Sequence, residues 1–110
     1  MATIQRRASY RIITRAIELD NQPLVAVLAP GAEDCEPALD PDQLRAALQT
    51  HPDGVIVYNQ HDAARALVDE LGLPATQVLI EIRQDTRGVL GLHALRRGPD
   101  GDETLELVYQ

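Results

Sequence analysis

A polar turn is the most promising site in the sequence. Four polar residues separate an apolar segment from an alanine- and leucine-rich one: Asn59, Gln60, His61 and Asp62. Turns between a buried strand and a helix often carry the ligand sites of α/β proteins. Helix N–H groups there favour anions, but the turn has no glycine to admit a phosphate, and Asp62 would repel it. We therefore predict a helix start capped by Asn59 or Asp62. Asn59, His61 and Asp62 are kept as candidate binding residues.

Cys35 is the only cysteine, so neither an internal disulfide nor a metal site of paired cysteines can form. It lies between Asp34 and Glu36, and nearby carboxylates disfavour the nucleophilic thiolate. We keep Cys35 as a candidate binding residue and expect a thiol of low reactivity.

The segment 30–42 is rich in acidic residues and proline, which is typical of a loop. Its carboxylates could hold Ca²⁺ or Mg²⁺, but they lack EF-hand spacing, so a solvated loop is the favoured interpretation. Alternatively, this acidic loop could contact a basic partner, including the arginine-rich first segment of this same chain. The histidines show no ligand spacing: His51, His61 and His93. We expect neither metal nor cofactor.

Hydrophobic patterning then predicts the elements that must position these residues. After a flexible start over residues 1–7, β-branched residues indicate a strand over 10–19. Further strands are expected over 24–29, 55–58, 76–84, 89–95 and 104–109, with helices over 41–50 and 62–71. Asp40 is a good N-cap for the first helix, and Gly72 suits the left-handed residue after the second.

The predicted order is β-β-α-β-α-β-β-β in one domain over residues 1–110. It indicates the α/β class, with α+β as an alternative, and one mixed sheet with two helices. Short apolar strands followed by helices predict parallel pairing, and the last three strands predict an antiparallel meander. From Leu24 to Leu95 the element order resembles the core of thioredoxin-like folds. The resemblance implies a reactive cysteine in the loop that holds Cys35, although the two-cysteine motif is absent.

Composition limits the possible partners. A net charge of −7 disfavours nucleic acid and anionic membranes, and the absence of Phe and Trp disfavours base stacking on an RNA-binding surface. No signal peptide, membrane-spanning segment, G-x-S-x-G, G-x-G-x-x-G or P-loop motif is recognisable. We therefore expect a small acidic cytoplasmic module that binds a protein partner or assembles with itself, without catalysis. Two alternatives stay open: a thioredoxin-like thiol or chaperone function through Cys35, and a small-ligand enzyme using the turn 59–62.

Overall fold

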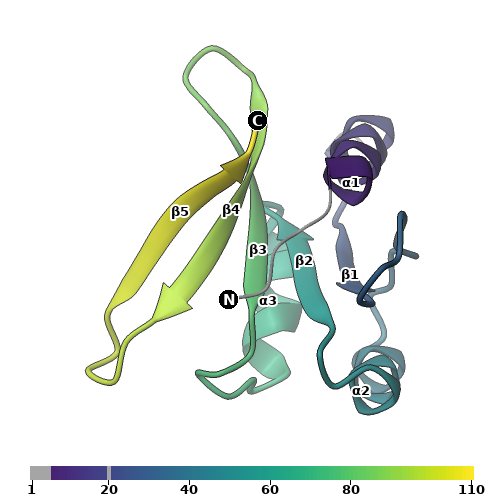
Figure 1. The fold of residues 1–110 in the computed structure, drawn as a ribbon, viewed down its shortest axis with the longest axis vertical. Helices are drawn as coiled ribbons and strands as arrows, with labels where there is room; N and C mark the ends of the chain where they lie inside the picture. The colour runs from purple at the N-terminus through teal and green to yellow at the C-terminus, as the bar shows by residue number, and fades with distance from the viewer. Residues whose placement is uncertain (1–5, 20) are drawn as a thin grey trace.

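The chain folds into one five-stranded sheet with helices on both faces, as described by a computed structural model (Figure 1). The structure describes residues 6–19 and 21–110. The helices are α1 (Arg6–Glu18), α2 (Pro41–Thr50) and α3 (Asp62–Glu70), and the strands are β1 (Val25–Leu28), β2 (Val55–Asn59), β3 (Leu79–Gln84), β4 (Leu90–Arg97) and β5 (Glu103–Tyr109). The predicted mixed α/β class is confirmed. No described helix is long and apolar enough to cross a membrane.

The first predicted element is wrong, because the segment expected as a strand over 10–19 lies in α1. Its β-branched residues favour a strand locally, but its buried positions follow a helical period. Ala8 and Ile12, four residues apart, are almost completely buried, and Ile13 and Ala16 pack beside them. Tertiary packing therefore overrides strand propensity here, and the protein has three helices rather than two. The expected flexible start over residues 1–7 is wrong at Arg6 and Arg7, which open α1. Positions 1–5 lie outside the described residues.

The strands lie in the order β1-β2-β3-β4-β5. As predicted, β2 and β3 are parallel across α3, and β3, β4 and β5 form an antiparallel meander. The expected parallel pairing of β1 with β2 is wrong, because these strands are antiparallel. The long loop after β1 runs back along that strand, where Ala38 N–H donates to the Val25 carbonyl at 2.8 Å. The loop has thus reversed the chain before α2 begins, so the crossover is not a standard βαβ unit.

Two apolar layers hold the helices on the sheet. One face packs against α1, with Ile12, Val57 and Leu92 at its centre. The other packs against α2 and α3 through Leu44 and Leu67. The hairpin end of β4 and β5 reaches beyond these layers as a two-stranded arm (Figure 1), whereas Tyr109 at the other end of β5 packs against the first layer.

Local contacts confirm several details of the sequence analysis. The Asp40 carboxylate accepts from the backbone N–H groups of Asp42 and Gln43 at the start of α2, and Gly72 ends α3 at a φ of 60°. The acidic loop contacts the arginine-rich first segment of the same chain, which forms α1. Two ion pairs join them, Arg7 to Glu33 at 2.7 Å and Arg15 to Asp34 at 3.4 Å.

Candidate functional site

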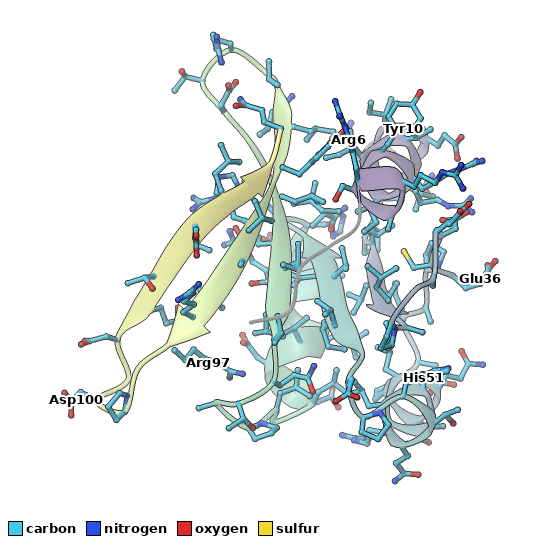
Figure 2. All side chains as sticks on the ribbon, viewed as in Figure 1. Arg6, Tyr10, Glu36, His51, Arg97 and Asp100 are labelled. Atoms are coloured by element: carbon cyan, nitrogen blue, oxygen red, sulfur yellow. The ribbon has the colours of Figure 1, made fainter. Side chains whose placement is uncertain are left out.

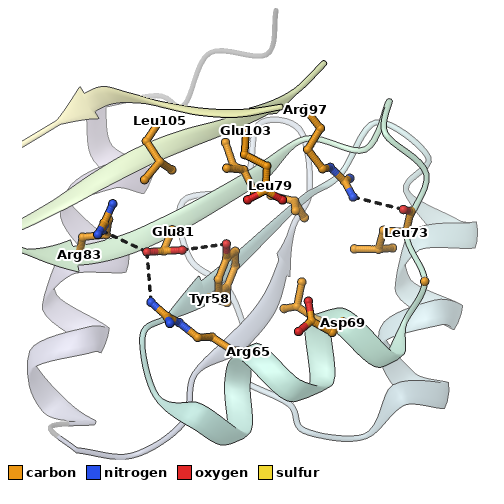
Figure 3. Close-up of a pocket in the computed structure, with 13 residues that line it drawn as sticks. Tyr58, Arg65, Asp69, Leu73, Leu79, Glu81, Arg83, Arg97, Glu103 and Leu105 are labelled. Carbon is orange, nitrogen blue, oxygen red and sulfur yellow. Dashed lines mark hydrogen bonds and ion pairs between the residues drawn. The ribbon is translucent and has the colours of Figure 1, made fainter. Parts of the chain in front are cut away.

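A groove of about 570 Å³ lies on the sheet face that α3 only partly covers, between α3, β4 and β5 (Figure 3). We call it the β5 groove. Its lining residues come from β2, α3, the segment after α3, and strands β3 to β5: Tyr58, Arg65, Val68, Asp69, Gly72, Leu73, Leu79, Glu81, Arg83, Leu95, Arg97, Glu103 and Leu105. The groove therefore mixes an apolar floor with several charged side chains.

Strand register arranges the groove in two transverse rows. Leu79, Leu95 and Leu105 are directly paired across β3, β4 and β5, which places three leucines side by side. The neighbouring row pairs Tyr58 with Glu81, Glu81 with His93, and His93 with Leu107. Because paired residues share a face of the sheet, Leu105 and Leu107 both belong to the face of the groove.

Glu81 is the charged centre of the groove and is only 8% exposed. The Tyr58 hydroxyl donates to its carboxylate at 3.0 Å, and Arg83 Nε lies 3.2 Å from the other oxygen (Figure 3). Arg65 of α3 lies 3.9 Å from that same oxygen. A buried carboxylate is tolerated only when such donors satisfy it, so this cluster joins β2, β3 and α3 through one side chain.

Burial and the adjacent Glu81 carboxylate raise the pKa of Tyr58 well above its usual value. The phenol therefore stays protonated at any physiological pH and acts as a hydrogen-bond donor. This geometry favours a structural pair over an acid–base pair, because a catalytic acid or base needs a pKa near the working pH.

The Tyr58–Glu81 pair is testable by a double-mutant cycle. Tyr58→Phe and Glu81→Gln are each expected to lower the free energy of unfolding by about 1 to 2 kcal/mol, because each breaks a buried hydrogen bond. The double variant should cost less than the sum, with a coupling of about 1 kcal/mol in urea denaturation. Asp69→Asn, an exposed carboxyl of the same groove, is the control and should change little. Additive single effects would show that the two side chains do not interact.

Arg97 closes one end of the β5 groove by tying β4 to the segment after α3. Its guanidinium donates to the carbonyls of Leu73 at 3.3 Å, Pro74 at 2.6 Å and Gln77 at 3.4 Å. Within the described residues, two buried atoms at the groove face lack a hydrogen-bond partner, Arg97 Nε and His93 Nδ1. Most buried polar atoms in folded proteins have a hydrogen-bond partner, so these two atoms are unusual.

β5 forms the open edge of the sheet beside this groove. It runs for seven residues and is exposed along almost its whole length. Leu105 is 38% exposed, Leu107 50% and Val108 40%. β5 contains no proline or lysine, and its charged residues are Glu103 and Glu106. These acids disfavour pairing with another acidic strand more than pairing with a basic one.

The predicted turn residues lie at a different cavity, of about 840 Å³, between α1 and the carboxyl ends of β2 and β3. Its polar lining is dominated by carboxamides, so we call it the amide cleft: Tyr10, Ile13, Ala16, Ile17, Asn21, Gln22, Asn59, Gln60, His61, Ile82, Gln84, Gly88, Val89, Leu90, Tyr109 and Gln110. Asn59 and His61 thus meet at one cavity, as the position of the turn suggests, whereas Asp62 is exposed and outside it.

The predicted cap of α3 by Asn59 or Asp62 is wrong, because His61 is the N-cap. Its Nδ1 accepts from Ala63 N–H at 3.2 Å. Asn59 instead joins three backbone segments: its Oδ1 accepts from the N–H groups of Leu24 and His61, and its Nδ2 donates to the Gln22 carbonyl at 2.7 Å. An asparagine can make these bonds together because its amide both accepts and donates.

Cys35 lies apart from both cavities and is only 4% exposed. Burial raises the pKa of its thiol to about 11, and Asp34 adds to the shift. Both facts disfavour the nucleophilic thiolate that a thiol function requires. Among the described residues, no three His, Cys, Asp or Glu side chains are grouped as a metal site.

Sequence reasoning missed the Glu81 cluster, because an isolated glutamate in a strand pattern resembles an ordinary solvent-facing residue. The sequence shows Glu81 and Arg83 on the polar side of a strand that alternates with Val78, Ile80 and Ile82. Only the pairing with β2 and the contact with α3 show that this polar side is covered at Glu81. Comparison of the chain with protein-family models, with curated proteins and with solved structures finds no match.

Proposed function

We propose that this protein is a non-catalytic cytoplasmic interaction module that binds an extended segment of a partner protein along β5. The observation that carries the proposal is the exposed edge of β5, with its row of leucines beside the β5 groove. An incoming strand would satisfy the free backbone groups of this edge by β-augmentation. Alternate side chains of that strand would lie over Leu105 and Leu107 on the groove face.

Charge favours a basic partner segment over a second copy of this chain. From Gly98 to Gln110 the sequence carries four acids and no basic residue: Asp100, Asp102, Glu103 and Glu106. A second copy paired at this edge would bring the same acids together, and like charges across strands destabilise pairing. A partner that alternates apolar with basic residues would place apolar side chains on the leucines and basic ones on the opposite face, beside Glu106, which is also paired with Arg96 at 2.8 Å. This surface is unsuited to nucleic acid, which demands a cationic footprint.

Peptide binding tests this proposal. The probe is a synthetic peptide of alternating valine and arginine, long enough to span β5, and its control alternates valine and glutamate. We expect the basic peptide to bind and the acidic one not to bind. Leu105→Lys with Leu107→Lys should weaken binding about a hundredfold, because it removes the apolar contact and adds repulsion. Fluorescence anisotropy measures both affinities.

Leu39→Lys is the matched control, since Leu39 is 47% exposed on a loop remote from β5. This variant should bind the basic peptide as well as the unmodified chain does. Equal binding by the β5 double variant would overturn the proposal. Sedimentation that shows a dimer dissociated by the β5 double variant would also overturn it, because a second copy would then occupy the edge.

A further inference from the structure

The amide cleft is built for an uncharged chemical group. None of its lining residues is Asp, Glu, Lys or Arg, although charged residues make up 25% of the chain. One wall is apolar and comes from Ile13 and Ile17 of α1 together with Val89. A charged group placed here would gain no counter-ion from the lining residues. The cleft therefore favours a neutral group that has an apolar face and polar edges.

Several polar groups in the amide cleft remain available to such a ligand. His61 Nδ1 accepts from Ala63 N–H, which leaves Nε2 as the ring atom that can donate. Gln84 Nε2 donates to the Gly88 carbonyl at 3.0 Å, which leaves its side-chain oxygen as an acceptor. The Gln60 side chain has no partner within the described residues. Donors and acceptors from two segments, the turn after β2 and the end of β3, thus converge on one cavity.

A basic hollow adjoins the amide cleft and shares Tyr10 and Tyr109 with it. Its three cationic residues lie on the first two turns of α1: Arg6, Arg7 and Arg11. Figure 2 shows Arg6 and Tyr10 together on this helix. Arg7 is already paired with Glu33 at 2.7 Å, the one acid of the hollow. Arg6 and Arg11 have no carboxylate partner among the described residues.

We propose that the amide cleft and this arginine hollow together bind a nucleoside phosphate. The base occupies the amide cleft, where carboxamides can pair with donor–acceptor edges of the kind that bases present. Its ring lies against the apolar wall of α1. The phosphate meets Arg6 and Arg11, whose guanidinium groups form charge-assisted hydrogen bonds with phosphate oxygens. The volumes of about 840 Å³ and 810 Å³ are within the range of small-ligand sites.

Isothermal titration with defined ligands tests this assignment. The panel contains the 5′-monophosphates of adenosine, guanosine, cytidine and uridine, their nucleosides, and ribose 5-phosphate. We expect one or more monophosphates to bind, each about 10- to 100-fold tighter than its nucleoside, because the phosphate adds charge-assisted bonds. Ribose 5-phosphate should not bind. Absence of binding by all four monophosphates would overturn the proposal, and equal binding of ribose 5-phosphate would reveal a bare anion site instead.

Three variants separate the two halves of the site. Gln60→Ala should weaken nucleotide and nucleoside alike by about tenfold, because it removes contacts to the base. Arg11→Gln should weaken the nucleotide about tenfold, because Arg6 still contacts the phosphate, and should leave the nucleoside unchanged. Arg45→Gln, an exposed arginine of α2, is the control for net charge and should have no effect. An Arg11→Gln variant that binds the nucleotide normally would contradict the assignment. These residues lie outside the β5 groove, so this proposal and the peptide proposal can fail separately.

Discussion

Replacing Ile12 with alanine is expected to lower the free energy of unfolding by about 3 kcal/mol. Ile12 is completely buried beneath α1, at the centre of the layer that includes Val57 and Leu92. Its truncation removes apolar contacts and leaves a cavity that a close-packed sheet cannot collapse to fill. Urea denaturation should show a lower midpoint with an unchanged slope.

Ile17 offers the matched control, because it lies on the same helix but is 61% exposed. Ile17→Ala should change the free energy of unfolding by less than about 0.5 kcal/mol, since alanine also has the higher helix propensity. The pair thus tests whether the side of α1 that carries Ile12, and not the side that carries Ile17, packs on the sheet. Equal losses in the two variants would contradict this buried side of α1.

Cys35 is expected to react with iodoacetamide at least about a hundredfold more slowly in the folded chain than in urea at the same neutral pH. The thiol is 4% exposed, and its pKa rises from 9.0 to about 11. That shift alone lowers the thiolate fraction about a hundredfold. Reaction at the rate of the unfolded chain would show an accessible thiolate and would support a thiol function for Cys35.

The raised pKa of Cys35 also predicts that the free energy of unfolding depends on pH. Because the pKa of Cys35 is higher in the folded state, its contribution is fully present below pH 9.0 and is lost as the pH rises toward 11. The free energy of unfolding should therefore fall across this range. Cys35→Ala should flatten the fall, and the part that remains should follow Tyr58, whose pKa is raised in the same direction. Constant stability across that range would contradict the burial of both groups.

Elements with a strong local signal could be predicted from the sequence. Asp40 and Gly72 mark the ends of their helices by their own chemistry, as a cap and as a left-handed residue. The short apolar strands and the meander follow from patterning and turns. The first segment could not be assigned from local signals. Its β-branched residues favour a strand, whereas the packing of Ile12 on the sheet stabilises a helix.

The positions of the two cavities depend on the directions in which the strands run, and hydrophobic patterning does not specify these directions. The antiparallel course of β1 arises from the loop that returns along Val25, and no local rule predicts that return. Asn59 and His61 of the predicted turn both line the amide cleft, at the carboxyl ends of the parallel strands β2 and β3. The β5 groove was not foreseen, since it exists only where the register joins Glu81 to Tyr58 and Leu105 to Leu95.

Hydrogen exchange of the β5 amides, with and without the alternating valine–arginine peptide, tests the proposed docking most directly. Amides on the free edge of residues 103–109 should exchange at least about tenfold more slowly when the peptide is bound, because the added strand accepts their hydrogen bonds. The amides of α1 and of the turn 59–62 should be unchanged. Unchanged exchange along β5 in a peptide-saturated sample, or protection confined to α1, would contradict the proposal that this edge receives the partner.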